Sequence, residues 1–313
     1  MTNGLARFEV CLDRLEKLIN EAAGQPDAAL WLYQNNARTP IFMLEGLAKL
    51  YGGLHDKKLF GKIEEHFKLI EDGLGAIDYY DGFAKQFAKD ATAAKGSAAF
   101  AHSKAAEKTK LLNDLLLKEQ WIGKKADRLL KLRIKLREAA WLDEKPEIKA
   151  IESFYRKSID KINGFAAGYQ DGFTELETQV HELRRKLRWL SIYPQALRGC
   201  IQLTKTSSHD KTVEKYLTPD IVSSPFNQMP DAGSNRYLLM FYKDPFLSLS
   251  WLISELGRLK DVGLRDVLLN ETGSAPDANG QAKILADATQ VCRTYFAEKN
   301  LEKMLNGIVK NTD

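Results

Sequence analysis

The chain has 313 residues, of which 44% are hydrophobic and 28% are charged, and its formal net charge is +4. This composition is ordinary for a folded globular protein, and no apolar run approaches the roughly 20 residues that span a bilayer. Three widely spaced cysteines argue against a disulfide framework, and the charged N-terminal segment lacks the apolar stretch of a secretory signal, so we expect a cytoplasmic protein.

Hydrophobic residues recur at helical spacing along the chain, and no segment shows the alternation typical of a β-strand. In the first half we expect helices at about 4–22, 27–50, 60–74, 79–89 and 97–142. Pro40 cannot donate a backbone hydrogen bond and is expected to bend the second helix. Gly75 is expected to separate the next two helices, and Gly123 to interrupt the last.

In the second half we expect helices at about 146–168, 172–204, 245–270 and 278–309. The segment 206–235 is rich in Ser, Pro, Asp and Gly and is predicted to be a long excursion between helices. The sequence therefore predicts an all-α fold. We expect two pseudo-repeated antiparallel helical bundles with long helices, at residues 1–143 and 144–313.

Positive charge is concentrated in two segments of the chain. Residues 104–137 contain eleven Lys or Arg against four Asp or Glu, and residues 181–205 contain six against one. Such a concentration predicts an anionic partner.

The sequence VHELRRKLRWL at 180–190 is the strongest candidate for a binding surface. Its predicted buried stripe consists of Val180, Leu183, Leu187 and Leu190. A second stripe, at the spacing i, i+3, i+4 and i+7 of one helical face, consists of His181, Arg184, Arg185 and Arg188. A guanidinium can bind two phosphate oxygens at once, so this row could contact several phosphates of an extended polymer. The alternative is a solvated face whose arginines pair with carboxylates of a neighbouring helix.

A sequence order occurs twice: a helix with an arginine is followed by Leu-Gly-x-aliphatic and an acidic residue. LGAIDYYD starts at Leu74 downstream of Arg38, and LGRLKDVG starts at Leu256 downstream of Arg184. This order resembles the CHAD family (conserved histidine α-helical domain). Members of that family have two helical halves, each with a His-x-x-Arg-x-x-x-Arg/Lys helix and a later Leu-Gly-x-Leu-Arg/Asn-Asp turn.

The second half of the chain resembles the family pattern well. His181, Arg184 and Arg188 have the spacing of the family helix, and Asp261 holds the acidic position of the turn. No alternating Glu-x-Glu-x-Lys strand occurs, so the triphosphate tunnel domain that often accompanies this family is not expected.

The first half departs from the pattern. Arg38 is retained, but Asn35 stands in place of the histidine and Phe42 in place of the second basic residue. In the turn, Asp78 occupies the basic position and Tyr79 the acidic one.

The resemblance implies a non-enzymatic module, without a cofactor, that binds inorganic polyphosphate or a related phosphate-rich anion in a basic groove between the halves. The expected binding residues are His181, Arg184, Arg185, Lys186 and Arg188, with Arg38 as a supporting charge and Lys131 and Lys135, from the second basic helix at 123–142, as outer contacts.

Two other functions are compatible with the sequence. The chain could be a helical scaffold that binds a protein partner through the arginine-rich face or the 206–235 excursion.

It could also be a metal-dependent phosphohydrolase if a turn at Gly75 brought together His66, Glu71, Asp72, Asp78 and Asp81. Alternatively, Gly75 ends one helix and Asp78 caps the next. Common metal and phosphate-loop motifs are absent, and no aromatic–basic interleaving indicates a nucleic-acid partner.

Overall fold

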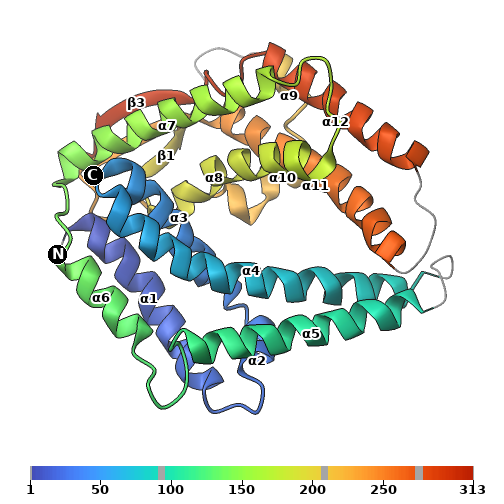
Figure 1. Cartoon of the computed structure of the whole chain (residues 1–313). Helices are drawn as coiled ribbons and strands as arrows, with labels where there is room; N and C mark the ends of the chain where they lie inside the picture. Colours follow the sequence, from blue (N-terminus) through green and yellow to red (C-terminus); the bar gives the residue numbers. More distant parts are fainter. Residues whose placement is uncertain (1, 91–95, 206–210, 272–277, 313) are drawn as a thin grey trace. The chain divides into compact units, whose positions relative to one another are not determined.

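The computed structural model describes residues 2–90, 96–205, 211–271 and 278–312. The protein is mainly helical, as predicted, and none of the helices in these ranges is long and apolar enough to cross a membrane. The chain divides into two compact units (Figure 1): Met1–Leu142 with Glu271–Ser274, and Asp143–Asn270 with Ala275–Asp313.

The first unit is a bundle in which α4 runs antiparallel to both α3 and α5 (Figure 1). Figure 1 shows α4 and α5 side by side along most of their length, and these two helices share extensive contacts. The elements of this unit are α1 (Asn3–Ala22), α2 (Ala28–Gln34), α3 (Arg38–Leu54), α4 (Lys57–Phe87), α5 (Ser97–Lys118) and α6 (Arg128–Glu138).

Aromatic rings form much of the core of the first unit. The ring centroids of Tyr51 and Trp141 are 5.1 Å apart, and Phe60 and Phe8 lie 5.5 and 5.8 Å from Trp141. Burying each such ring stabilises the fold by about 1.5–3 kcal/mol. A side chain at Gly4 would overlap the indole of Trp141, so α1 requires a glycine there.

Two expected helix interruptions in the first unit are wrong. The break between α2 and α3 falls at Asn36, whose φ is 56°, and not at Pro40. Pro40 instead lies in the first turn of α3, where its missing N–H has no intrahelical acceptor to lose. Gly75 interrupts nothing, because α4 is one continuous helix from Lys57 to Phe87. The expected break at Gly123 is confirmed, since α5 ends at Lys118 and α6 begins at Arg128.

The second unit combines helices with a small sheet in the order β1-β2-β3, in which β1 pairs parallel with β2 and β3 pairs antiparallel with β2. Helix α7 packs on the sheet, where the rings of Tyr155 and Phe241 are 5.0 Å apart. The elements are α7 (Glu144–Ala167), η1 (Leu176–His181), α8 (Glu182–Ala196), β1 (Ile201–Thr204), α9 (Lys211–Glu214), α10 (Pro219–Ser223), η2 (Pro225–Asn227), β2 (Tyr237–Tyr242), α11 (Lys243–Glu271), α12 (Ala278–Ala297) and β3 (Leu305–Lys310).

The strands correct the expectation of an entirely helical second half. Helix α8 ends at Ala196, and the positive φ of Arg198 and Gly199 turns the chain into β1, although we expected helix through residue 204. Such left-handed residues commonly end helices. Likewise, residues 305–310 are strand and not the end of α12. Short apolar runs fit a strand as well as a helix, so periodicity alone cannot separate them.

The excursion at 206–235 has a topological role, because parallel strands require a long crossover connection. Its described part contains α9, α10 and η2 and leads from β1 to β2, while residues 206–210 lie outside the described residues. Within the described ranges only the second unit has strands, so the order of elements does not confirm a pseudo-repeat.

Candidate anion-binding site

The helix predicted at 180–190 forms, and its expected core stripe is buried: Val180, Leu183, Leu187 and Leu190. Its first turns are a π-helix, η1, which ends at His181 and continues directly into α8. Single π-helical turns are rare and often occur at functional sites. The basic residues of this segment therefore begin where the helix changes its pitch.

Arg184 crosses from α8 to the backbone of α11. Its Nε donates a hydrogen bond to the carbonyl of Ile253 at 3.1 Å. A Cβ at Gly257 would stand 3.0 Å from both Nε and Nη2, so a glycine lets the guanidinium lie against the helix. Glycine costs a helix about 1 kcal/mol relative to alanine. The close approach of the guanidinium gives that cost a structural reason.

The charge of Arg184 is only partly offset by the protein. Burial lowers the pKa of this half-buried guanidinium. The carboxylate of Asp261 has the opposite but smaller effect, so the pKa stays below its ordinary value. Asp261 itself pairs with Lys260, Nζ to Oδ1, at 3.1 Å. Among the described residues no carboxylate lies within ion-pair distance of Arg184. A cation that is partly removed from water and keeps unused N–H donors favours an anionic ligand.

Lys260 is a further cation near this face, and it directly precedes the predicted Asp261 in the sequence. It stands three residues after Gly257, at the basic position of the LGRLKD turn, and that position was the signal for it. The hydrogen bond from His181 lowers the pKa of Glu177 most, and Lys260 and Arg185 lower it further. These basic groups from α11, η1 and α8 therefore lie around one carboxylate.

Three other predicted residues of this face, His181, Arg185 and Lys186, already have partners on their own helix. His181 Nδ1 lies 2.7 Å from Glu177 Oε1, while Arg185 and Lys186 share Glu182 at 2.6 and 2.8 Å. Such exposed pairs contribute about 0–1 kcal/mol, so a strong anion can displace them. Arg188 is half-buried, and its carbonyl accepts a hydrogen bond from Ser191 Oγ at 2.9 Å.

Arg38 of the first unit lies against a helix glycine in the same way as Arg184. We call the space beside such a glycine, which the guanidinium occupies, a notch. A Cβ at Gly75 would stand 3.0 Å from its Nη2. Here, however, Nε donates to Glu71 at 2.8 Å and Nη1 donates to Asp78 at 2.9 Å. These two carboxylates offset the charge of the guanidinium, which weakens the case for Arg38 as a supporting charge for an anion.

The two notches differ at the residues next to the glycine. Glu71 and Asp78 stand four residues before and three residues after Gly75. The same positions around Gly257 are taken by Ile253 and Lys260. The second notch therefore lacks both carboxylates and gains a cation.

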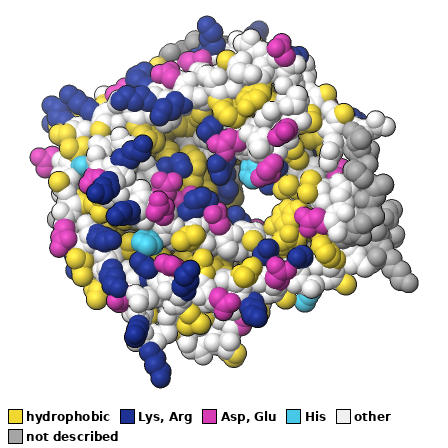
Figure 2. Space-filling view, viewed as in Figure 1, with side chains coloured by type: hydrophobic (Ala, Val, Ile, Leu, Met, Phe, Trp, Pro, Cys, Tyr) yellow, Lys and Arg dark blue, Asp and Glu magenta, His cyan; other side chains and the backbone are white. Residues whose placement is uncertain are grey.

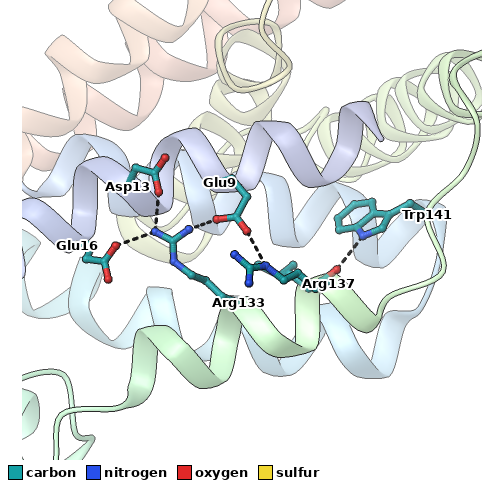
Figure 3. Close-up of polar contacts among 7 residues, drawn as sticks. Glu9, Asp13, Glu16, Arg133, Arg137 and Trp141 are labelled. Carbon is teal, nitrogen blue, oxygen red and sulfur yellow. Dashed lines mark hydrogen bonds and ion pairs between the residues drawn. The ribbon is translucent and has the colours of Figure 1, made fainter. Parts of the chain in front are cut away.

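The second basic segment has much of its charge neutralised within the first unit. In Figure 3, Arg133 of α6 points to three carboxylates of α1, and Arg137 joins it at Glu9. Lys131 pairs with Asp127 at 2.7 Å, which weakens its case as an outer contact for an anion. Lys135 is exposed, and no ion pair of its side chain is found in the described part of the chain.

The acidic segment 64–81 does not form a catalytic cluster. Because α4 is continuous, its side chains reach several different partners: Glu71 and Asp78 both bind Arg38, Asp72 binds Lys68, Asp81 binds Tyr33 and Lys85, and His66 contacts Arg128. Within residues that the structure describes, no group of three potential ligands could hold a metal ion. The hydrolase hypothesis therefore loses its proposed site.

On the face shown in Figure 2, Lys and Arg side chains lie among Asp and Glu side chains over much of the surface. The Arg184 notch therefore stands out by its missing carboxylates and not by the number of its cations.

Comparison of the chain with protein-family models, with curated proteins and with solved structures finds no match.

Proposed function

We propose that the second unit is a non-enzymatic module that binds inorganic polyphosphate or a related phosphate-rich anion at Arg184. In this proposal the chain is a divergent, cytoplasmic relative of the CHAD family. The observation that carries it is the half-buried Arg184 guanidinium, which has one backbone acceptor at Ile253 and no carboxylate partner among the described residues.

The chemistry of the site suits phosphate oxygens. The unused N–H groups of Arg184 can form charge-assisted hydrogen bonds to an anion, and such bonds are about twice as strong as neutral ones. Lys260 adds a point charge one helical turn from Gly257. Arg185 and Lys186, which share the single carboxylate of Glu182, could turn to a polyanion that lies along α8.

The contrast with Arg38 supports this assignment. In the first unit the protein supplies its own anions, Glu71 and Asp78, to an arginine beside a glycine. In the second unit the equivalent positions hold Ile253 and Lys260, so an external anion can take the role of those carboxylates.

The test is a titration of the full chain with long-chain polyphosphate at several salt concentrations. Arg184→Ala should weaken binding about tenfold or more, because one charge-assisted contact is worth about 1.5–3 kcal/mol. Arg184→Lys should restore only part of the affinity, since an ammonium lacks the planar fork. Arg38→Ala is the matched control and should bind like the wild type.

Each phosphate that the protein neutralises should make the affinity fall more steeply as the salt concentration rises, as it does for nucleic-acid backbones. The wild type should therefore show a steeper salt slope than Arg184→Ala. Equal affinity and equal slope in the wild type and in Arg184→Ala would contradict the proposal. Release of phosphate from the polymer would contradict its non-enzymatic part.

A scaffold function is the second candidate, and one exposed ring favours it. Phe226, in the 206–235 excursion, is 79% exposed. The turn that presents it is anchored, because Gln195 Nε2 donates to the carbonyl of Gln228 and Asn227 Oδ1 accepts from Ser250 Oγ. If this turn binds a partner, Phe226→Ser should abolish co-purification of that partner without altering polyphosphate affinity.

A further inference from the structure

Helix α6 carries large apolar side chains on its outward face as well as on its inward face. Leu132 and Leu136 are buried in the first unit, whereas Leu130 is 60% exposed and Ile134 is 46% exposed. A surface helix normally has one apolar stripe, which faces the core. Leu130 and Ile134 are one turn apart, so they form a short ridge that points away from that core.

Cations flank this ridge on both sides. Lys131 and Lys135 follow its two apolar residues by one position each, and Arg137 lies at the opposite side with its side chain largely exposed. Lys131 has an exposed ion pair to Asp127, one turn away, and also donates a hydrogen bond to Gln120 Oε1 at 3.1 Å. One carboxylate, Glu138, ends the helix. The outward face is thus an apolar ridge between basic edges.

The protein itself shows what kind of element α6 accepts. On its neighbouring face, Arg133 and Arg137 bind an acidic stripe of α1, drawn in Figure 3. That stripe consists of Glu9, Asp13 and Glu16, at the spacing i, i+4 and i+7 of one helical face. A helix with regularly spaced carboxylates can therefore lie along α6 and satisfy its cations.

We propose that the outward face of α6, formed by Leu130, Ile134, Lys131 and Lys135, binds an acidic amphipathic helix of a partner protein. The partner helix would place two apolar residues one turn apart against the ridge and Asp or Glu beside the lysines. A bilayer surface is a poorer fit, because interfacial helices present a long apolar face and this ridge has two side chains. The surface belongs to the first unit and does not depend on the Arg184 site.

The probe is a fluorescent synthetic helix of about 20 residues, long enough to be partly helical in water. It carries leucines on one stripe and glutamates on both flanks, and a matched peptide has lysine at every glutamate position. Anisotropy with the full chain should show binding of the acidic peptide and not of the basic one. Leu130→Ser/Ile134→Ser should weaken that binding about tenfold or more, as expected for central apolar anchors.

Leu111→Ser on α5 is the matched control, because Leu111 is equally exposed, at 54%, and lies outside the ridge. It should bind the acidic peptide like the wild type, and circular dichroism should show both variants to be folded. The proposal is overturned if the double variant binds as well as the wild type, or if no binding occurs at about 1 mM peptide. It is also overturned if vesicles of phosphatidylcholine and phosphatidylserine bind through Leu130 and Ile134 while the peptide does not.

Discussion

The guanidinium of Arg184 lies against the backbone of α11 at Gly257, where a Cβ would stand 3.0 Å from both Nε and Nη2. The first unit repeats this relationship between Arg38 and Gly75. In both units a glycine that looks like a helix breaker lies inside a continuous helix. Its role is to make room for an arginine from another helix.

Gly257→Ala should therefore weaken polyphosphate binding, because the new methyl group moves the guanidinium of Arg184 by a few tenths of an ångström. Stability should change by less than about 1 kcal/mol, since the strain is offset by the better helix propensity of alanine. Titration and urea denaturation measure the two effects. Gly75→Ala is the matched control: it should shift Arg38 without changing affinity, and a loss of affinity there would contradict the assignment to the second unit.

An exchange of the residues around Gly75 should create an anion site in the first unit. Glu71→Ile/Asp78→Lys removes both partners of Arg38 and reproduces the Ile253 and Lys260 pattern. We expect the exchanged protein to gain about one further phosphate-binding site, because an unpaired guanidinium needs a new anion. Calorimetric titration with short-chain polyphosphate gives the stoichiometry.

The control for this exchange is Arg38→Ala in the exchanged protein, which should remove the added site and leave the original one. A contrary result is possible: binding by the wild type depends on Arg184, but the exchanged protein gains no further site. That result would show that an arginine beside a glycine is not enough to form the site. Folding of each variant is checked by thermal unfolding.

Arg133→Ala should destabilise the first unit by about 2 kcal/mol or more. The Arg133 side chain is only 11% exposed and pairs with Glu9, Asp13 and Glu16, so its loss leaves the poorly exposed Glu9 without its main cation. Urea denaturation measures the change. Arg156→Ala, which breaks an exposed pair to Glu152 one turn away, should cost less than about 0.5 kcal/mol.

Glu45 should make stability depend on pH near neutrality. Its side chain is buried in α3, and its Oε2 has no hydrogen-bond partner. Burial, reinforced by the nearby Glu71, raises the pKa of Glu45 from an ordinary 4.5 to about 7. The folded state therefore binds a proton that the unfolded state has lost, and stability falls as pH rises through this window.

Glu45→Gln, which mimics the protonated form, should match the wild type at pH 5 and exceed its stability at pH 8. The gain at pH 8 should be on the order of 3 kcal/mol, the equivalent of the shift in pKa. Chemical denaturation at both pH values measures it. An equal difference between the two proteins at pH 5 and pH 8 would show that Glu45 does not titrate in this range.

Much of the fold could be predicted from the sequence, because local periodicity determines where a helix buries its apolar face. The stripe of Val180, Leu183 and Leu187 gave both the helix and its buried side. The strands were missed, since a short apolar run such as YLLMFY at 237–242 fits helix and strand alike. Only pairing with β1 and β3 makes it a strand.

The sequence by itself determined which residues are charged and which face of each helix they share. It placed Arg38 and Arg184 at matching positions of a repeated motif and predicted Arg38 as a supporting charge, but it could not show which groups lie beside each guanidinium. The tertiary structure showed what surrounds each guanidinium: the carboxylates of Glu71 and Asp78 bind Arg38, whereas Arg184 donates to the backbone carbonyl of Ile253. The reason is physical: helical spacing fixes neighbours along one helix, whereas the neutralisation of a charge depends on atoms a few ångströms away on another helix, far along the chain.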